Sequence, residues 1–133
     1  MDKKEISYEI IDYSGITNVK FYTSTDNGSY IPSHWHRAVE ILYMQEGELD
    51  VTVESSSFTI YPGDCILINA NVIHSTKCII PNRAIVLQIP LDFIEKYIPD
   101  VQQFMFIWDY QTKDPVKKTK LDMLKTTLEQ LQI

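Results

Sequence analysis

Short apolar runs separated by turn residues occupy the chain from about residue 4 to residue 89. The run "LDVTVE" alternates, with Leu49 and Val51 on one side and polar residues on the other, which is typical of a half-buried strand. The runs "CILIN" and "RAIVLQI" are continuous and indicate strands buried on both faces. Turn signals such as Asn27-Gly28 separate the runs. The pattern predicts a mainly β protein, a sandwich or a small barrel.

The spacing of apolar residues changes after Pro90. "LDFIEKYIPD" predicts a short helix, and "VQQFMFIWDY" predicts either a helix or a covering segment. Asp114 and Pro115 have the residue types of an N-cap and a first helical position, so a further helix is expected to begin there. We therefore expect one domain, with a β barrel over residues 1–90 and helices over residues 91–133 that pack on it.

Four leucines recur at spacings of three, four and three along the last expected helix: Leu121, Leu124, Leu128 and Leu131. This narrow, leucine-only stripe has the spacing of a short coiled coil, so it predicts a helix that joins two copies of the chain in a homodimer. The alternative is a helix that packs the same stripe back on the barrel.

Composition and charge narrow the classes of function. A net charge of −6, without a dense basic cluster, argues against nucleic-acid binding by this chain alone. The sequence contains no apolar run of about 18 residues and no leader-like N-terminus, so we expect a cytoplasmic protein without membrane contact. Cys65 and Cys78 lie in apolar stretches and are expected to be buried thiols.

The stretch "HWHRAVE" contains two of the three histidines of the chain. In a strand, His34 and His36 would point to the same side, close enough for both imidazoles to reach one ion. Glu40 has the same parity but would lie roughly 13 Å beyond His36 in an unbroken strand. A shared metal site therefore requires a turn of the chain around Arg37 and Ala38.

"GSYIPSHWHRAVEILYMQEG" resembles the first cupin motif throughout, and "PGDCILINANVIH" resembles the second in a degraded form. Asn69 and Asn71 stand where that family usually has Pro and Gly. The resemblance implies a double-stranded β-helix, or jelly-roll, barrel whose cavity is lined by both motifs. It also implies four metal ligands: His34, His36, Glu40 and His74.

Nearly the whole chain, including "LQIPLDFIEKYIPD", resembles the N-terminal sensor domain of AraC-type transcriptional regulators. The resemblance implies a non-enzymatic domain with no catalytic residues, which binds a small polar effector such as a sugar and dimerises through its helices. DNA would be bound only by a separate helix-turn-helix domain beyond residue 133.

The role of the four polar residues stays open between three interpretations. They can line an effector pocket without an ion, hold a single divalent transition metal, or be hydrogen-bonded structural residues. We expect the ligand to be bound by His34, His36, Glu40 and His74, with Leu42 and Met44 as apolar wall. The alternative function is a metal-dependent cupin enzyme, an isomerase or dioxygenase, that uses the same four polar residues.

Overall fold

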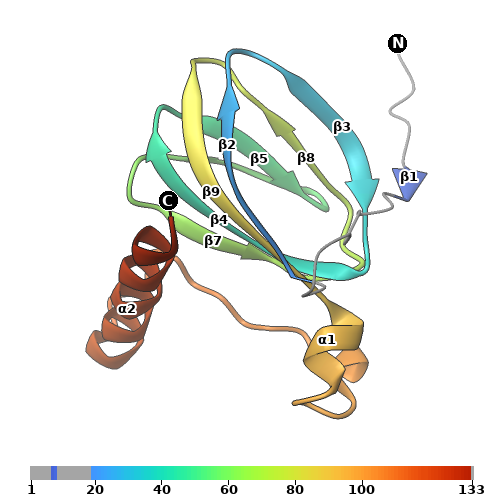
Figure 1. The fold of residues 1–133 in the computed structure, drawn as a ribbon. Coiled ribbons are helices and arrows are strands. Elements are labelled where there is room, and N and C mark those ends of the chain that lie inside the picture. The colour runs from blue at the N-terminus through green and yellow to red at the C-terminus, as the bar shows by residue number, and fades with distance from the viewer. Residues whose placement is uncertain (1–6, 9–18, 133) are drawn as a thin grey trace.

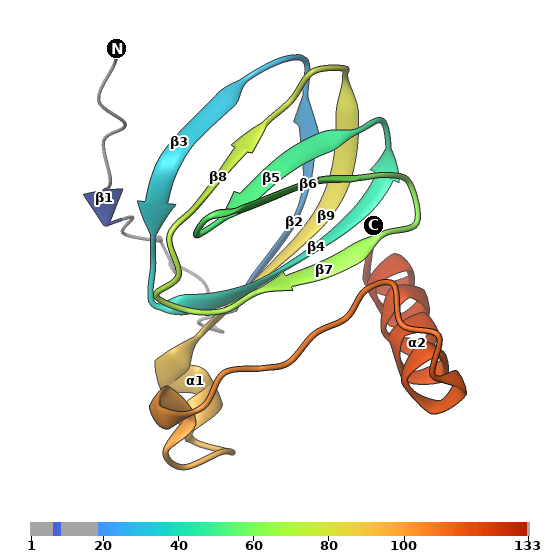
Figure 2. The same cartoon turned by 180° about the vertical axis from the view of Figure 1, so that it is seen from behind.

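The computed structural model describes residues 7–8 and 19–132 and shows two β-sheets that face each other, with helices at one side (Figures 1 and 2). Most of the N-terminal stretch, for which the sequence predicts no leader, lies outside the described residues. The strands are β1 (Ser7–Tyr8), β2 (Lys20–Asp26), β3 (Tyr30–Trp35), β4 (Ala38–Glu46), β5 (Leu49–Val53), β6 (Ser56–Ile60), β7 (Cys65–Ile68), β8 (His74–Lys77) and β9 (Asn82–Pro90).

The chain passes repeatedly between the two sheets. One sheet has the order β1-β3-β8-β5-β6 and the other has the order β2-β9-β4-β7. Apart from the parallel pair of β1 and β3, neighbouring strands are antiparallel. The helical elements follow as α1 (Leu91–Glu95), the 3-10 helix η1 (Val101–Gln103) and α2 (Pro115–Leu131). The predicted mainly β jelly roll with C-terminal helices is confirmed.

The space between the sheets is filled by the inward side chains of both. Val51 and Ile60 of one sheet and Met44 of the other are fully buried there. The expected alternation of β5 is confirmed, since Leu49 and Val53 pack against the same cluster. Three of the four residues of β7 are buried, as its continuous apolar run predicts. Cys65 and Cys78 are buried free thiols, also as predicted.

Gly47 occupies the tight turn between β4 and β5. Its φ is +75°, in the left-handed region that favours glycine. A Cβ atom at this position would lie only 2.1 Å from the carbonyl oxygen of Pro81 and 2.8 Å from the Cα atom of Asn82. The turn therefore requires glycine for two reasons, the backbone conformation and the close approach of the loop that precedes β9.

Helix α2 begins where the sequence predicts, with the Asp114 carboxylate accepting a hydrogen bond of 3.2 Å from the Val116 amide and Pro115 as its first residue. The helix covers the outer face of the four-stranded sheet (Figure 1). Among the described residues, no helix is both long and apolar enough to cross a membrane.

The leucine stripe of α2 packs mostly against the sheet of its own chain. Leu121 and Leu128 are buried in a cluster with Ile41, Tyr43 and Ile85 of the sheet, because this outer face is itself apolar and needs cover. Leu124 packs partly against the same cluster, and Leu131 is 57% exposed. The stripe thus packs on the barrel, and a dimer contact through this helix remains a prediction.

The connecting segment, residues 104–113, is a covering segment and not a helix. It runs below the barrel from η1 to α2 (Figure 2). The indole Nε1 of Trp108 donates a hydrogen bond of 2.9 Å to the carbonyl of Cys65 on β7. The Tyr110 ring stacks on Phe58 of β6, with 5.8 Å between the centroids. The segment therefore contacts the edge strands of both sheets.

The hydroxyl of Tyr43 on β4 donates a hydrogen bond to the Glu129 carboxylate of α2. Burial and this carboxylate both raise the pKa of Tyr43, to about 12. The folded state therefore holds the Tyr43 proton more tightly than the unfolded state does. The protonated hydroxyl contributes fully to stability below the ordinary pKa of 10.0, and this contribution is lost as the pH rises toward 12.

We expect Tyr43→Phe to be less stable than the native protein at pH 8, by about 1 kcal/mol, because the hydrogen bond to Glu129 is lost. The difference should shrink as the pH rises through the interval from 10.0 to about 12. Urea denaturation of both proteins across this pH range measures the difference. A constant difference would contradict this, because it would mean that folding does not raise the pKa of Tyr43.

Candidate metal and ligand site

The chain turns sharply between His36 and Glu40, as a shared site requires. Strand β3 ends at Trp35, a bend follows at Arg37, and β4 begins at Ala38 in the opposite sheet. Two backbone hydrogen bonds hold the bend: the His36 carbonyl accepts from the Asn71 amide at 2.8 Å, and the Arg37 carbonyl accepts from the Leu91 amide at 3.0 Å. The Oε2 atom of Glu40 consequently lies 3.7 Å from Nε2 of His36.

His74 reaches the same place from β8, where it pairs directly across from His34 of β3. It is buried, and its Nε2 atom lies 3.5 Å from Oε2 of Glu40. The two asparagines that replace the family's Pro and Gly do not turn it away. Asn71 adopts a φ of +62°, and asparagine tolerates this left-handed conformation better than other side chains except glycine.

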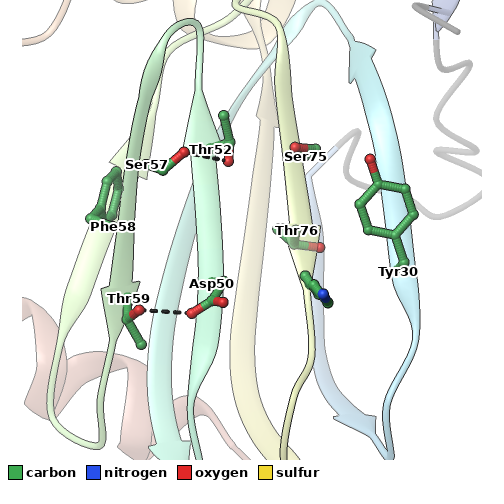
Figure 3. A pocket seen from close by; sticks show the side chains of 9 residues that line it. Tyr30, Asp50, Thr52, Ser57, Phe58, Thr59, Ser75 and Thr76 are labelled. Atoms are coloured by element: carbon green, nitrogen blue, oxygen red, sulfur yellow. Dashed lines mark hydrogen bonds between the residues drawn. The ribbon is translucent and has the colours of Figure 1, made fainter. Parts of the chain in front are cut away.

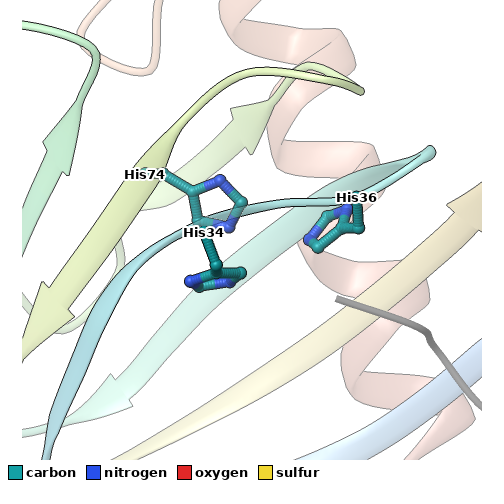
Figure 4. Close-up of side chains that lie close together, drawn as sticks. All are labelled: His34, His36 and His74. Carbon is teal, nitrogen blue, oxygen red and sulfur yellow. The ribbon is translucent and has the colours of Figure 1, made fainter. Parts of the chain in front are cut away.

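The three imidazoles are oriented in the same way, by their own backbone. Each Nδ1 atom lies within hydrogen-bond distance of a carbonyl oxygen two residues away: 2.8 Å for His34 to Pro32, 3.0 Å for His36 to Ala38, and 2.8 Å for His74 to Val72. A carbonyl only accepts, so Nδ1 carries the proton and Nε2 carries the lone pair of the neutral ring. The rings converge (Figure 4), with ligand atoms of all three within 4.8 Å of one another.

Glu40 is held as a carboxylate inside this cluster. Burial alone would raise its pKa, but when His36 and His74 carry a proton toward it their positive charge outweighs burial and lowers the pKa of Glu40 to about 2. Its other oxygen, Oε1, accepts a hydrogen bond of 3.0 Å from the amide of Gln88. Gln88 lies opposite Glu40 on β9 and was not predicted, although it is the one amide in the apolar run "RAIVLQI".

The cluster has the electrostatics of a cation site. Imidazole lone pairs that face a carboxylate repel it unless a proton or a metal ion lies among them. The Nε2 atom of His74 is buried and, among the described residues, has no hydrogen-bond partner. Three imidazole nitrogens and one carboxylate are also a donor set that divalent transition metals accept. The residues present therefore fit such an ion.

A cavity of about 140 Å³ between the sheets extends from this cluster. Leu42 lines it, whereas Met44, expected as apolar wall, does not and is fully buried in the core between the sheets. The wall also includes polar residues that the sequence analysis did not single out, among them Tyr22, Ser24 and Gln88. The cavity is thus lined by both polar and apolar side chains.

A second hollow, of about 350 Å³, lies on the five-stranded sheet, and no histidine lines it (Figure 3). Strand register places four of its residues in one row across four strands: Tyr30, Lys77, Asp50 and Thr59. Thr59 donates to Asp50 at 2.7 Å, and Thr52 and Ser57 bond each other at 2.9 Å. The members of these two pairs satisfy one another, as is usual on the solvated face of an antiparallel sheet.

The cupin-domain family profile matches residues 21–89, which include all four polar residues of the cluster. This match covers more than half of the chain, and the chain therefore belongs to the cupin family. No curated protein sequence matches it.

Solved structures, a cupin superfamily protein among them, share the fold at low sequence identity. A cupin superfamily protein of Desulfitobacterium hafniense is 14% identical, with a TM-score of 0.52, over 54% of this chain and 67% of that one. The EutQ protein of Clostridium difficile is 18% identical, with a TM-score of 0.50, over 56% and 58%. The DMSP lyase DddQ of Ruegeria pomeroyi is 28% identical, with a TM-score of 0.50, over 55% of this chain and 39% of that one. These similarities establish the cupin fold, whereas the AraC-type resemblance rests on the sequence motifs.

Proposed function

We propose that this cupin domain is the effector-sensing domain of an AraC-type transcriptional regulator, which binds a small polar molecule in its cavity. Occupancy would favour one arrangement of the C-terminal helix and so control a separate DNA-binding domain. The proposed assembly is a homodimer, and DNA would be contacted only by that further domain.

One observation carries this proposal: a single strand joins the cavity to the helix. On β4, Glu40 and Leu42 line the cavity, while Ile41 and Tyr43 lie on the opposite face in contact with α2. Because alternate residues of a strand face opposite sides, a shift of β4 caused by a ligand would move the helix contacts as well.

We further propose that the ligand is held with the help of one divalent transition metal at His34, His36, His74 and Glu40. Such an ion would supply a Lewis acid that attracts hydroxyl or carboxylate oxygens. Gln88 keeps the Glu40 carboxylate in place through Oε1, which leaves Oε2 directed at the imidazoles. The polar wall with Tyr22 and Ser24 would contact the remainder of the effector.

The experiment is a thermal-shift screen of tag-free protein with monosaccharides and amino acids, each with and without Zn²⁺. A ligand at about 100 times its dissociation constant stabilises the protein by about 2.7 kcal/mol, which raises the melting temperature by several degrees. We expect such a shift without chemical conversion of the ligand, and we expect it to vanish in Glu40→Ala. Ser57→Ala, in the hollow on the five-stranded sheet, serves as the control and should keep the shift.

The second candidate function is a metal-dependent cupin enzyme. It is favoured by the convergence of three histidines beside a carboxylate and by the similarity to the DMSP lyase DddQ. The chain has only three histidines and all belong to this cluster, so none is left to act as a separate acid or base. Metal-dependent turnover of any compound in the screen would decide for the enzyme and against the sensor.

A further inference from the structure

The loop of residues 69–73 carries His74 into the site. It joins β7 to β8, and His74 is the first residue of β8. Its centre is fixed to the other histidine segment, because the Asn71 amide donates to the His36 carbonyl at 2.8 Å. The position of this loop therefore affects two of the three imidazoles.

Asn69, at the start of the loop, is bound to the connecting segment 104–113 by two hydrogen bonds. Its side-chain amide nitrogen donates to the Phe106 carbonyl at 3.0 Å, and its side-chain oxygen accepts from the Phe106 amide at 2.9 Å. The Asn69 side chain thus both donates to and accepts from the Phe106 backbone, as the peptide groups of a neighbouring β-strand do. Proline, which the cupin family usually has here, could make neither bond, and aspartate could make only one.

The connecting segment leads directly into α2 at Pro115. It also contacts the strands, through Trp108 to the Cys65 carbonyl and through Tyr110 to Phe58. Within residues 7–8 and 19–132, which the structure describes, the hydrogen bonds that join the His74 loop to this segment are the two at Asn69.

From this arrangement we infer that Asn69 is a positioning residue: it couples the position of the His74 imidazole to the position of the connecting segment that leads to α2. The inference rests on the proposed binding of a divalent metal at the histidines. By thermodynamic linkage, if the bound metal strengthens the Asn69–Phe106 contact by some factor, that contact strengthens metal binding by the same factor. Residues that orient metal ligands typically change affinity by about 10- to 100-fold.

Two readouts test this on the full chain, with Zn²⁺ as the probe. The first is the dissociation constant of Zn²⁺, and the second is hydrogen exchange of the Phe106 amide, whose proton is the one bonded to Asn69. In the native protein, Zn²⁺ should slow exchange at Phe106 about tenfold. In Asn69→Ala, exchange should no longer respond to Zn²⁺, and the dissociation constant should rise by the same factor of about ten.

Three controls sharpen the test. Asn69→Asp keeps the acceptor for the Phe106 amide but lacks the donor, so both effects should be intermediate, and this variant serves if Asn69→Ala fails to fold. Gln102→Ala, an exposed position before the segment, should behave as the native protein. The indole proton of Trp108, which β7 holds, should exchange at the same rate with and without Zn²⁺.

The outcomes separate the two proposals. If the native protein binds Zn²⁺ and exchange at Phe106 does not change, the role of Asn69 is refuted while the metal site stands. If the native protein does not bind Zn²⁺, the metal site is refuted and the inference falls with it. Equal slowing at Phe106 and Trp108 would show general stabilisation, which also overturns the role of Asn69.

Discussion

His74→Ala is expected to weaken Zn²⁺ binding by about 1000-fold, on the order of one lost ligand in a four-ligand site. The Nε2 atom of His74 is buried, is directed at Glu40 Oε2 from 3.5 Å, and has no hydrogen-bond partner among the described residues. Its orientation is also fixed in advance, since Nδ1 is bonded to the Val72 carbonyl. Competition with a chromophoric chelator, on protein purified without a His-tag, measures the dissociation constant.

Thr76→Val is the matched control for this variant. Thr76 lies two residues further along β8 and lines the same cavity, and valine has nearly the same shape. Zn²⁺ binding should be unchanged within about a factor of three. Native Zn²⁺ affinity in a folded His74→Ala protein would contradict the proposed metal site, and circular dichroism would verify that the variant is folded.

Gly47→Ala is expected to lower the free energy of unfolding by about 4 kcal/mol, enough to unfold a large fraction of a marginally stable domain. The added Cβ would meet the Pro81 carbonyl at 2.1 Å, and the φ of +75° disfavours alanine as well. No side-chain rotation can relieve the clash, because the Pro81 oxygen and the Asn82 Cα atom belong to the backbone. The strain at positive φ is likewise a property of the backbone. Urea denaturation followed by circular dichroism gives the loss directly.

Gly63→Ala separates the two costs. Gly63 also has a left-handed φ, +95°, but a Cβ there would meet no atom within 4 Å. Only the conformational cost applies, about 1 to 2 kcal/mol. Losses of equal size in the two variants would mean that the loop before β9 moves aside easily and that the turn at Gly47 is not sterically constrained.

Local patterns were sufficient to predict the elements and the mainly β class, whereas the jelly roll itself was implied by the resemblance to the cupin motifs. The alternation around Val51 and the continuous run of β7 correspond to burial on one face and on both faces. Asp114 and Pro115 marked the start of α2 because the capping interaction is made by adjacent residues. Such features depend on near neighbours in the sequence, so one sequence contains the information.

Features that depend on long-range contacts could not be predicted in the same way. The turn at Arg37 is fixed by Asn71 and Leu91, which are distant in sequence. The leucine stripe of α2 has coiled-coil spacing, but the partner that buries Leu121 and Leu128 is the apolar outer face of the same chain's sheet. Gln88 joins the site only through its register with Glu40 on β4.

The histidines and the carboxylate do not belong to the same layer of the sandwich. His34 and His74 lie on the five-stranded sheet, whereas Glu40 and its partner Gln88 lie on the four-stranded one. A cation shared among them would act as a cross-link between the two halves of the protein and oppose any sliding of one over the other. The rigidity of the whole sandwich would then depend on a single small ion at one end of it.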